Sequence, residues 1–256
     1  MDNLESYRPL ERFSDRAVLY ADYRPSYPAG VLDHFKKELA LQPGHVIADI
    51  GAGTGLFAKP FLENGNRVIC VEPNGSMREQ GQKYLKGFKD CAWSDGKAES
   101  TMLKDKSVDF ITCAQSFHWF HPDRATMEFR RVGRPKCITV LIWNTRLKDS
   151  SPFMKEYELL LHQHGKEYDK ISDARVNEEK ISLFFGGRAG KAVFPNGRAL
   201  NYTQFIGRAF SSSYMPASGT PEHEAAEKAL ALLFNAHQKE GCVTFDYETR
   251  MYYGRP

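Results

Sequence analysis

The chain has 256 residues, of which 41% are apolar and 26% charged, and its formal net charge is +3. This length suits one large α/β domain, with or without a modest cap, and the apolar share is enough to bury a core. The small charge excess argues against nucleic acid or an anionic membrane as a partner. Five cysteines are scattered without a C-x-x-C pair or a histidine cluster, so the sequence predicts no metal site and no disulfide framework.

The N-terminal residues MDNLESYRPLERF are charged and contain no apolar segment of the kind that a signal peptide needs. No apolar run approaches the ~20 residues that span a bilayer. We therefore expect a cytoplasmic protein, as a monomer or a homodimer. Residues 1–27 are polar and aromatic, and we interpret them as an N-terminal lid segment.

Apolar periodicity predicts strands that alternate with helices in the first part of the chain. The predicted strands cover residues 45–50, 67–71, 108–114 and 137–143, and the predicted helices cover residues 28–39, 56–63, 76–86 and 122–131. This alternation is typical of parallel βαβ units, with helices on both faces of the sheet and right-handed crossovers.

After Trp143 the pattern changes. Helices are predicted over residues 152–164 and 221–238. Between them the sequence is irregular to about Ser213, and we expect residues 146–213 to be an insertion that caps the carboxyl edge of the sheet. Residues 243–253 alternate apolar and polar side chains, which predicts an antiparallel strand or hairpin that closes the sheet. Residues 214–256 would thus return to the core.

The sharpest local signal is the sequence DIGAGTG at residues 49–55, which follows a predicted strand and opens a predicted helix. Glycine allows a positive φ and lets a ligand approach the backbone without a Cβ in the way. The turn also aims free N–H groups of the helix N-terminus at whatever binds there. A tight packing turn favours glycine as well, so this motif alone leaves both interpretations open.

Glu72 follows the second predicted strand, 21 positions after Gly51. An acid at this point can accept hydrogen bonds from the hydroxyls of a ribose. Taken alone, it could be a solvated loop glutamate. Together with the glycine turn, it indicates an adenosine-type ligand at the switch point of an open α/β sheet.

The glycine spacing separates two kinds of cofactor. A dinucleotide site typically has G-x-G-x-x-G, so that the helix start holds a pyrophosphate, whereas this chain has G-x-G-x-G with Asp49 just ahead of it. A carboxylate beside the turn favours a cationic ligand over a phosphate. The spacing therefore favours S-adenosylmethionine, which carries a sulfonium and an ammonium, over a nicotinamide cofactor.

At this point the sequence resembles class I S-adenosylmethionine-dependent methyltransferases, through their first two motifs. The resemblance continues through residues 93–100 (WSDGKAES), similar to the family's adenine-contacting loop, and through residues 107–120, similar to its fourth strand. Residues 23–28 (YRPSYP) and 117–119 (FHW) are similar to the type 11 branch, which includes trans-aconitate methyltransferase-like proteins.

The resemblance implies a fold and a division of the chain. The fold would be α/β, with a Rossmann-like, mostly parallel seven-stranded sheet, helices on both faces, a C-terminal antiparallel strand and an inserted cap after the fifth strand. Residues 28–145 would be the cofactor-binding core of a single methyltransferase domain spanning residues 1–256.

The resemblance also assigns residues to the cofactor. Gly51, Ala52, Gly53 and Gly55 would line its methionine part, next to Asp49, and Glu72 would hold the ribose. Pro73, Asn74 and Met77 would flank the adenine, with Ala98 and Glu99 at its edge. Gln115, Ser116 and Phe117 would lie near the sulfonium, and Tyr20 and Arg24 would close over the carboxylate end. Many relatives have Asp where this chain has Lys97, so the adenine contacts here would come from the backbone at Ala98.

Methyl transfer from a sulfonium is an in-line displacement, in which the protein mainly aligns the reactants, removes water and, where needed, deprotonates the nucleophile. His118 is the candidate general base, because histidine titrates near neutral pH and this one follows a predicted strand. A structural role beside Trp119 is the interpretation that we favour. A carboxylate acceptor would need no base, and Arg24 or Arg146 could hold a second acidic group.

The predicted function is methyl transfer to a small-molecule acceptor with an O-, N- or C-nucleophile. An NAD-dependent oxidoreductase and a non-catalytic S-adenosylmethionine-binding protein are the alternatives. RNA methylation would call for a basic face with exposed aromatic side chains, and the composition does not favour nucleic acid as a partner.

Overall fold

The computed structural model describes residues 25–166, 168, 177–212 and 214–256. The described helices are α3 (Ala29–Lys37), α4 (Ala58–Glu63), α5 (Gly75–Tyr84), the short 3-10 helix η3 (Phe117–Trp119), α6 (Pro122–Val132), α7 (Pro152–His164), α9 (Glu178–Phe184), α10 (Tyr202–Phe210) and α11 (Pro221–His237). The described strands are β1 (Val46–Ile50), β2 (Arg67–Val71), β3 (Cys91–Ser94), β4 (Val108–Ala114), β5 (Gly133–Arg146), β6 (Gly190–Pro195), β7 (Arg198–Asn201), β8 (Cys242–Phe245) and β9 (Tyr247–Gly254). Within these ranges, no helix is both long enough and apolar enough to cross a membrane.

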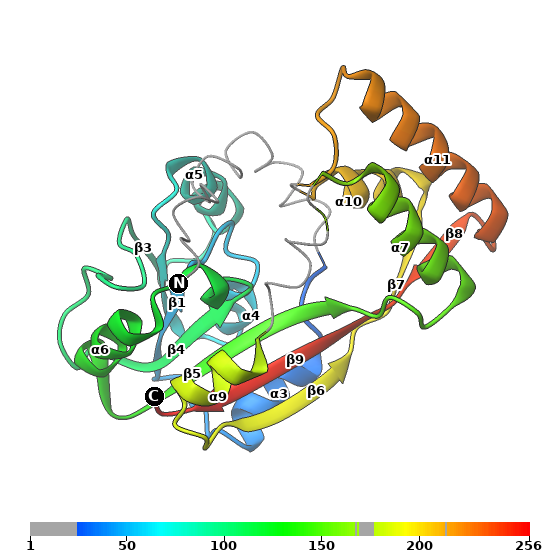
Figure 1. The fold of residues 1–256 in the computed structure, drawn as a ribbon. Coiled ribbons are helices and arrows are strands. Elements are labelled where there is room, and N and C mark those ends of the chain that lie inside the picture. Colours follow the sequence, from blue (N-terminus) through cyan, green and yellow to red (C-terminus); the bar gives the residue numbers. More distant parts are fainter. Residues whose placement is uncertain (1–24, 167, 169–176, 213) are drawn as a thin grey trace.

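Seven of these strands form one sheet in the order β3-β2-β1-β4-β5-β9-β6 (Figure 1). The strands from β3 to β5 run parallel to one another, and β9 pairs antiparallel with both β5 and β6. The strand order reverses between β1 and β4, which is the switch point where open α/β sheets bind ligands. This topology confirms the predicted Rossmann-like sheet and its C-terminal antiparallel strand.

Helices cover both faces of the sheet, as predicted. On one face, α3 and α4 bury Phe35 and Phe61, whose ring centroids are 4.9 Å apart, against the strands. On the other face, α6 and α9 bury Phe129 and Phe184. Figure 1 shows α9 in front of the sheet and α3 behind it. Both faces of the central strands are therefore apolar, as parallel strands covered by helices require.

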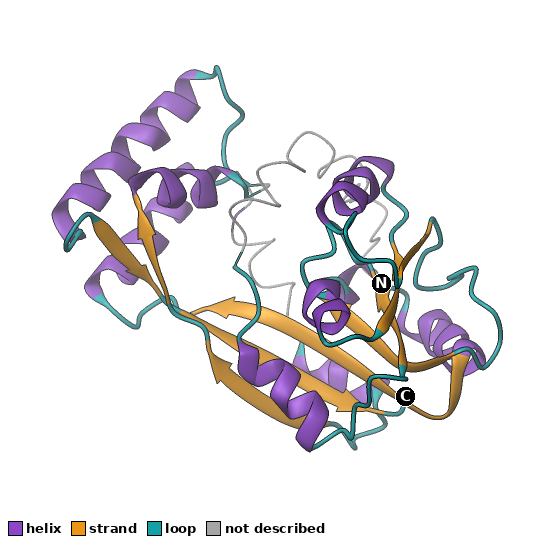
Figure 2. Cartoon of the chain, turned by 180° about the vertical axis from the view of Figure 1, so that it is seen from behind, coloured by secondary structure: helices purple, strands orange, loops and turns teal. Residues whose placement is uncertain are grey.

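The helices α7, α10 and α11, with the antiparallel pair β7–β8, form a lobe with its own apolar core. Rings of Phe153, Tyr157, Phe205 and Phe245 interlock in this core, with centroids 4.9 to 6.4 Å apart. Figure 2 shows the lobe beyond one end of the long strands of the sheet. We refer to it below as the helical lobe.

The prediction of an irregular stretch from the end of the helix at residues 152–164 to about Ser213 was wrong, because α9, β6, β7 and α10 lie there. Nor do residues 146–213 form one insertion, since β6 is an edge strand of the main sheet while α7 and α10 belong to the helical lobe. Likewise, residues 214–256 do not all return to the sheet, since α11 and β8 pack in the lobe. The side chains of β6 alternate between half-buried and exposed, so this edge strand has no continuous apolar run to reveal it.

Residues 243–253 are not one closing strand. The extended segment is interrupted at Asp246, so that β8 pairs with β7 and β9 pairs with the main sheet. The break is fixed by the Asp246 carbonyl, which accepts from the Leu147 amide at 3.0 Å, and by its carboxylate, which accepts from the Ser150 hydroxyl at 2.8 Å. β9 lies inside the sheet and β6 is its edge.

Candidate functional site

A glycine turn leaves the carboxyl end of β1. Gly51, Gly53 and Gly55 have φ values of +68°, +57° and +78°, in the region that residues with a Cβ rarely adopt. Because these conformations are not helical, α4 begins at Ala58, two residues later than predicted. The amides of Gly51 and Ala52 both donate to the carbonyl of Val71, at 2.8 and 3.1 Å, which joins the turn to the end of β2.

The glycines of the turn make room for different neighbours. A Cβ on Gly51 would lie 2.6 Å from the Cβ of Ser116, whose hydroxyl donates to the Ile50 carbonyl at 2.7 Å. A Cβ on Gly55 would instead lie 2.5 Å from a methyl of Leu85, behind the turn. Gly51 and Gly53 are half-buried and Gly55 is buried. Packing alone thus accounts for Gly55, which was predicted to line the methionine part of the cofactor.

Glu72 connects the glycine turn to the next helix. Its carboxylate accepts from the Gly53 amide at 2.8 Å and from the Asn74 amide at 2.9 Å. Burial raises the pKa of Glu72, and these two amides and the nearby Arg78 partly offset that rise. Each carboxylate oxygen has two acceptor positions, so one on each oxygen is left for a hydroxyl pair.

The predicted adenine-flanking residues meet beside the same turn. Asn74 caps the N-terminus of α5 and accepts from the Met77 amide at 3.0 Å. The Met77 methyl reaches back to Gly53, where it would lie 3.3 Å from a Cβ. Asn74 and Met77 are buried and Pro73 is exposed. Residues from two βα connections are thereby brought together, although their contact with adenine stays a prediction.

Asp49 is a buried acid beneath the turn. One of its carboxylate oxygens accepts from the Thr112 hydroxyl at 2.8 Å, and the other is buried with no hydrogen-bond partner among the described residues. Burial raises the pKa of Asp49 to about 7, the Thr112 bond opposes this rise, and the Glu72 carboxylate adds to it. A buried carboxylate with an unused oxygen fits a site for a cationic ligand.

The connection after β3 forms a tight turn at the edge of the site. Backbone bonds of 3.0 and 2.9 Å join Lys97 and Ser100, with Ala98 and Glu99 between them. Ala98 is buried in the core on the α6 face, while the Lys97 side chain is exposed. The Glu99 carboxylate accepts from the His121 amide at 2.8 Å, so it is already engaged at the start of α6.

Gln115, directly after β4, has a φ of +58°. Its amide donates to the Ile142 carbonyl at 2.9 Å, and its side-chain amide donates to the Asn144 carbonyl at 3.3 Å. A residue other than glycine in this conformation is uncommon, and such strain is concentrated at functional sites. Gln115 and Ser116 lie at the carboxyl end of β4, and their place near the sulfonium stays a prediction.

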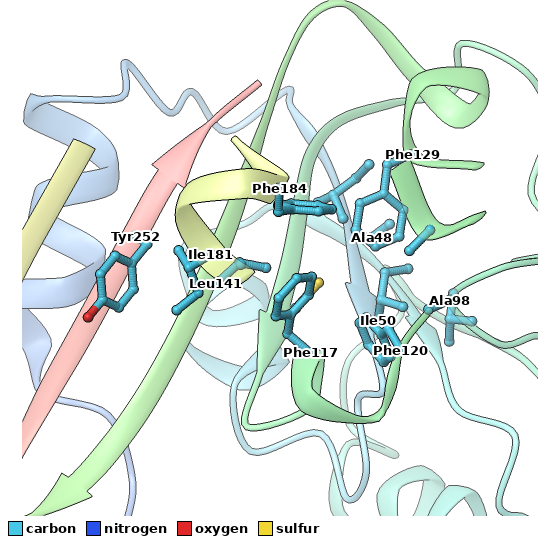
Figure 3. Packing of buried hydrophobic residues seen from close by; sticks show 14 of the residues in the cluster. Ala48, Ile50, Ala98, Phe117, Phe120, Phe129, Leu141, Ile181, Phe184 and Tyr252 are labelled. Atoms are coloured by element: carbon cyan, nitrogen blue, oxygen red, sulfur yellow. The ribbon is translucent and has the colours of Figure 1, made fainter. Parts of the chain in front are cut away.

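The ring of Phe117 does not point toward the glycine turn. It packs with Phe184 at a centroid distance of 4.8 Å and with Phe120 at 6.1 Å, inside the core on the α9 face (Figure 3). The reason is that η3 begins at Phe117 and turns the side chain into the sheet core. His118 stacks obliquely on Trp119, with centroids 4.7 Å apart. Tyr20 and Arg24, predicted to close the site, lie outside the described residues.

A polar network that the sequence analysis missed lies at the end of β5. The side-chain carbonyl of Asn144 accepts from the Thr249 hydroxyl at 2.6 Å and from the Asn196 side-chain amide at 3.0 Å. Both asparagines donate to the backbone of the segment before α3, including the Ser26 carbonyl, at 3.4 and 3.0 Å. Only Asn144 carried a signal, as a polar residue at the carboxyl end of an apolar strand; the other two meet it through strand pairing.

Comparison with known families points in one direction. Residues 48–141 match the sequence model of a family described as "Methyltransferase domain". An uncharacterized methyltransferase-like protein of Schizosaccharomyces pombe is 32% identical over 195 residues, which cover 75% of this chain and 73% of that protein. An uncharacterized methyltransferase of Mycobacterium bovis is 35% identical over 134 residues, about half of each chain (52%).

Solved structures show the same fold. A protein named as a candidate type II methyltransferase from Anaeromyxobacter dehalogenans superposes with a TM-score of 0.67 at 21% identity, over 91% of this chain and 98% of that one. A candidate methyltransferase from an antibiotic biosynthesis pathway of Anabaena variabilis gives a TM-score of 0.61 at 22% identity, over 89% and 98%. At these identities the likeness shows the architecture alone.

Proposed function

The chain belongs to the methyltransferase family, and from that premise we propose that it transfers a methyl group from S-adenosylmethionine to a small-molecule acceptor. The observation that carries this proposal is the 2.8 Å hydrogen bond from the Gly53 amide to the Glu72 carboxylate. It brings the glycine turn and the predicted ribose acid to one point, at the sheet's switch point.

Two carboxylates would contact the cofactor, and one of them, Asp49, favours S-adenosylmethionine over a nicotinamide. Glu72 would accept from the ribose hydroxyls through its remaining lone pairs, and the unused oxygen of Asp49 lies beneath the turn. The buried Asp49 carboxylate would repel a pyrophosphate, whereas it would attract the ammonium or sulfonium of S-adenosylmethionine. Gly51, Ala52, Asn74, Met77, Ala98 and Ser116 would complete the walls of the site.

S-Adenosylmethionine would supply the methyl group on a sulfonium. The protein's own share would be alignment and exclusion of water. Gln115 and Ser116 would form the floor near the reacting centre, held by bonds to Asn144 and Ile50. The helices α7 and α10 would cover the acceptor, which keeps a capping role for part of residues 146–213.

The cofactor proposal is tested by titration calorimetry with S-adenosylmethionine, S-adenosylhomocysteine and NAD. We expect the first two to bind and NAD not to bind. Glu72→Ala should weaken S-adenosylhomocysteine binding about 100-fold, because hydrogen bonds to a charged acceptor contribute about 1.5–3 kcal/mol each. Glu179→Ala, which removes an exposed acid of α9, is the matched control and should bind like the parent chain. Tight NAD binding, or unchanged affinity in Glu72→Ala, would refute the assignment.

A further inference from the structure

Arg208 is a buried cation in the helical lobe. It lies on α10, is 4% exposed, and donates to the Tyr247 hydroxyl at 2.6 Å and to the Ser212 hydroxyl at 3.0 Å. In the part of the chain that the structure describes, no carboxylate forms an ion pair with it. A charge that is buried with only neutral partners is unfavourable, so this arginine calls for an explanation.

Its neighbours do not supply the missing negative charge. Arg146, at the end of β5, hydrogen-bonds to the Glu158 carboxylate and to the Tyr168 hydroxyl. Lys148 also binds Glu158, at 2.9 Å. Among the described residues, Glu158 thus pairs with Arg146 and Lys148 and not with Arg208, which Arg146 repels. Arg208 is therefore a buried guanidinium without an ion-pair partner among the described residues, beside a second, largely buried guanidinium that is already paired.

An unsatisfied hydroxyl lies in the same cluster. The Tyr157 side chain is fully buried, and its hydroxyl has no hydrogen-bond partner among the described residues. The Arg146 guanidinium lies 5.1 Å from the centroid of the Tyr157 ring, and its Nε is likewise buried without a described partner. Burial raises the pKa of Tyr157, while Arg208 and Arg146 both act to lower it, so both cations are near its hydroxyl.

These groups make a chemically coherent set. Guanidinium N–H groups and a phenolic hydroxyl are the donors that an oxyanion accepts from. The rings of Phe245 and Tyr247 lie 5.8 and 5.7 Å from the Arg208 guanidinium carbon and provide apolar surroundings, in which a charged hydrogen bond is stronger than in water.

The cluster also lies next to the predicted transfer site. Arg146 is two residues beyond Asn144, whose carbonyl accepts from the Gln115 side chain after β4. Figure 1 shows α7 and α10 beyond the end of β5, across from α5. An acceptor bound between the two parts would have its reactive atom toward β4 and the rest toward the lobe.

We propose that Arg208, with Arg146 and Tyr157, binds an oxyanion of the methyl acceptor, so that the acceptor is an organic acid or a phosphate ester. This inference rests on the proposed methyl transfer for the identity of its ligand. The anion compensates the buried charge of Arg208 and gives the Tyr157 hydroxyl its partner.

The test measures binding in the presence of saturating S-adenosylhomocysteine at constant ionic strength. The probes are succinate, citrate, benzoate and phenyl phosphate, with succinamide and benzamide as neutral counterparts. At least one anion should bind, and its neutral counterpart should bind at least tenfold more weakly. Preference for benzoate or for phenyl phosphate separates a carboxylate site from a phosphate site.

Two variants connect the binding to the cluster. Arg208→Gln should lower the affinity for the anion at least tenfold and change the S-adenosylhomocysteine affinity less than twofold. Tyr157→Phe removes only the hydroxyl, so the lobe should fold, and the anion should bind at least threefold more weakly. Arg124→Gln makes the same charge change at an exposed position of α6 and should have no effect.

The proposal is overturned if none of the anions binds, if the neutral amides bind equally well, or if anion binding is unchanged in both Arg208→Gln and Tyr157→Phe. Loss of S-adenosylhomocysteine binding is a different result. It would refute the cofactor proposal. The anion titrations on the cofactor-free chain would still decide whether Arg208, Arg146 and Tyr157 bind an anion.

Discussion

The Gly53 amide donates to the Glu72 carboxylate over 2.8 Å, and this bond joins two connections that leave neighbouring parallel strands. The other oxygen of Glu72 accepts from Asn74, the residue that caps α5. One carboxylate thus fixes the turn after β1 and the start of the helix after β2. The geometry of the proposed cofactor site is therefore set without a ligand, which would lower the ordering cost of binding.

Gly51→Ala tests how tightly the turn is packed. The new Cβ would lie 2.6 Å from the Cβ of Ser116, at a backbone φ of +68°. We expect a loss of about 2–4 kcal/mol in the free energy of unfolding, because both the clash and the left-handed backbone are unfavourable. Urea unfolding measures the loss. Gly44→Ala, where nothing lies within 4 Å of a Cβ, should change stability by no more than about 0.5 kcal/mol; equal stabilities of the two variants would contradict the packing.

Asp49 should make the cofactor-free protein less stable as the pH rises. Burial raises its pKa from 3.8 to about 7, so the folded state favours the protonated acid. The stabilisation that the raised pKa of Asp49 gives the folded state is fully present below pH 3.8 and is lost as the pH rises through about 7. The loss amounts to at most about 4 kcal/mol for a shift of about three units.

Asp49→Asn should remove this dependence. We expect its free energy of unfolding, measured in urea from pH 5 to pH 8, to fall less with pH than that of the parent chain. Asp149→Asn changes an exposed acid in the same way and should follow the parent curve. Parallel curves for Asp49→Asn and the parent chain would show that Asp49 is ionised in the folded state throughout this range.

Local signals explain what could be predicted from the sequence. The glycine turn, Glu72 and the strands around them follow from patterns within a few residues, since apolar runs that end in glycine or acid mark the carboxyl ends of parallel strands. The direction of the Phe117 ring could not be predicted, because it depends on η3, which no pattern in FHW indicates.

Long-range pairing explains what could not be predicted. The alternation over residues 243–253 is the same on both sides of Asp246, so the sequence gives no sign that β8 and β9 enter different sheets. Arg208 lies in an amphipathic helix, where an arginine ordinarily faces solvent; here it is buried against Phe245 of β8 and Tyr247 of β9.

In the network at the end of β5, the effects of Asn144 and Asn196 on the free energy of unfolding should be coupled. Asn144 and Asn196 bond to each other at 3.0 Å and both hold the Ser26 carbonyl. Asn144→Ala and Asn196→Ala should each cost about 1–3 kcal/mol, because each leaves buried polar groups without a partner. The double variant should cost less than the sum, with a coupling of at least about 0.5 kcal/mol from a double-mutant cycle in urea. Strict additivity would mean that the two side chains act independently.

His118 distinguishes the kinds of acceptor chemistry. It stacks on Trp119 in η3, close to Gln115, so it could act either as a base or as a packing residue. If the acceptor is methylated on a carboxylate, its oxygen is already ionised and no base is needed. His118→Gln should then lower kcat/KM less than about tenfold, since general base catalysis typically contributes about 10²–10⁴-fold.

The measurement is the pH profile of kcat/KM for His118→Gln and the parent chain, with an acceptor identified among the acids. A carboxylate acceptor predicts that both profiles keep the same shape. A drop of 100-fold or more, together with loss of a limb near neutral pH, would instead assign His118 as the base. The methylated atom would then be a hydroxyl, amine or carbon acid, and the anion held by Arg208 would be a second group of the acceptor that binds without reacting.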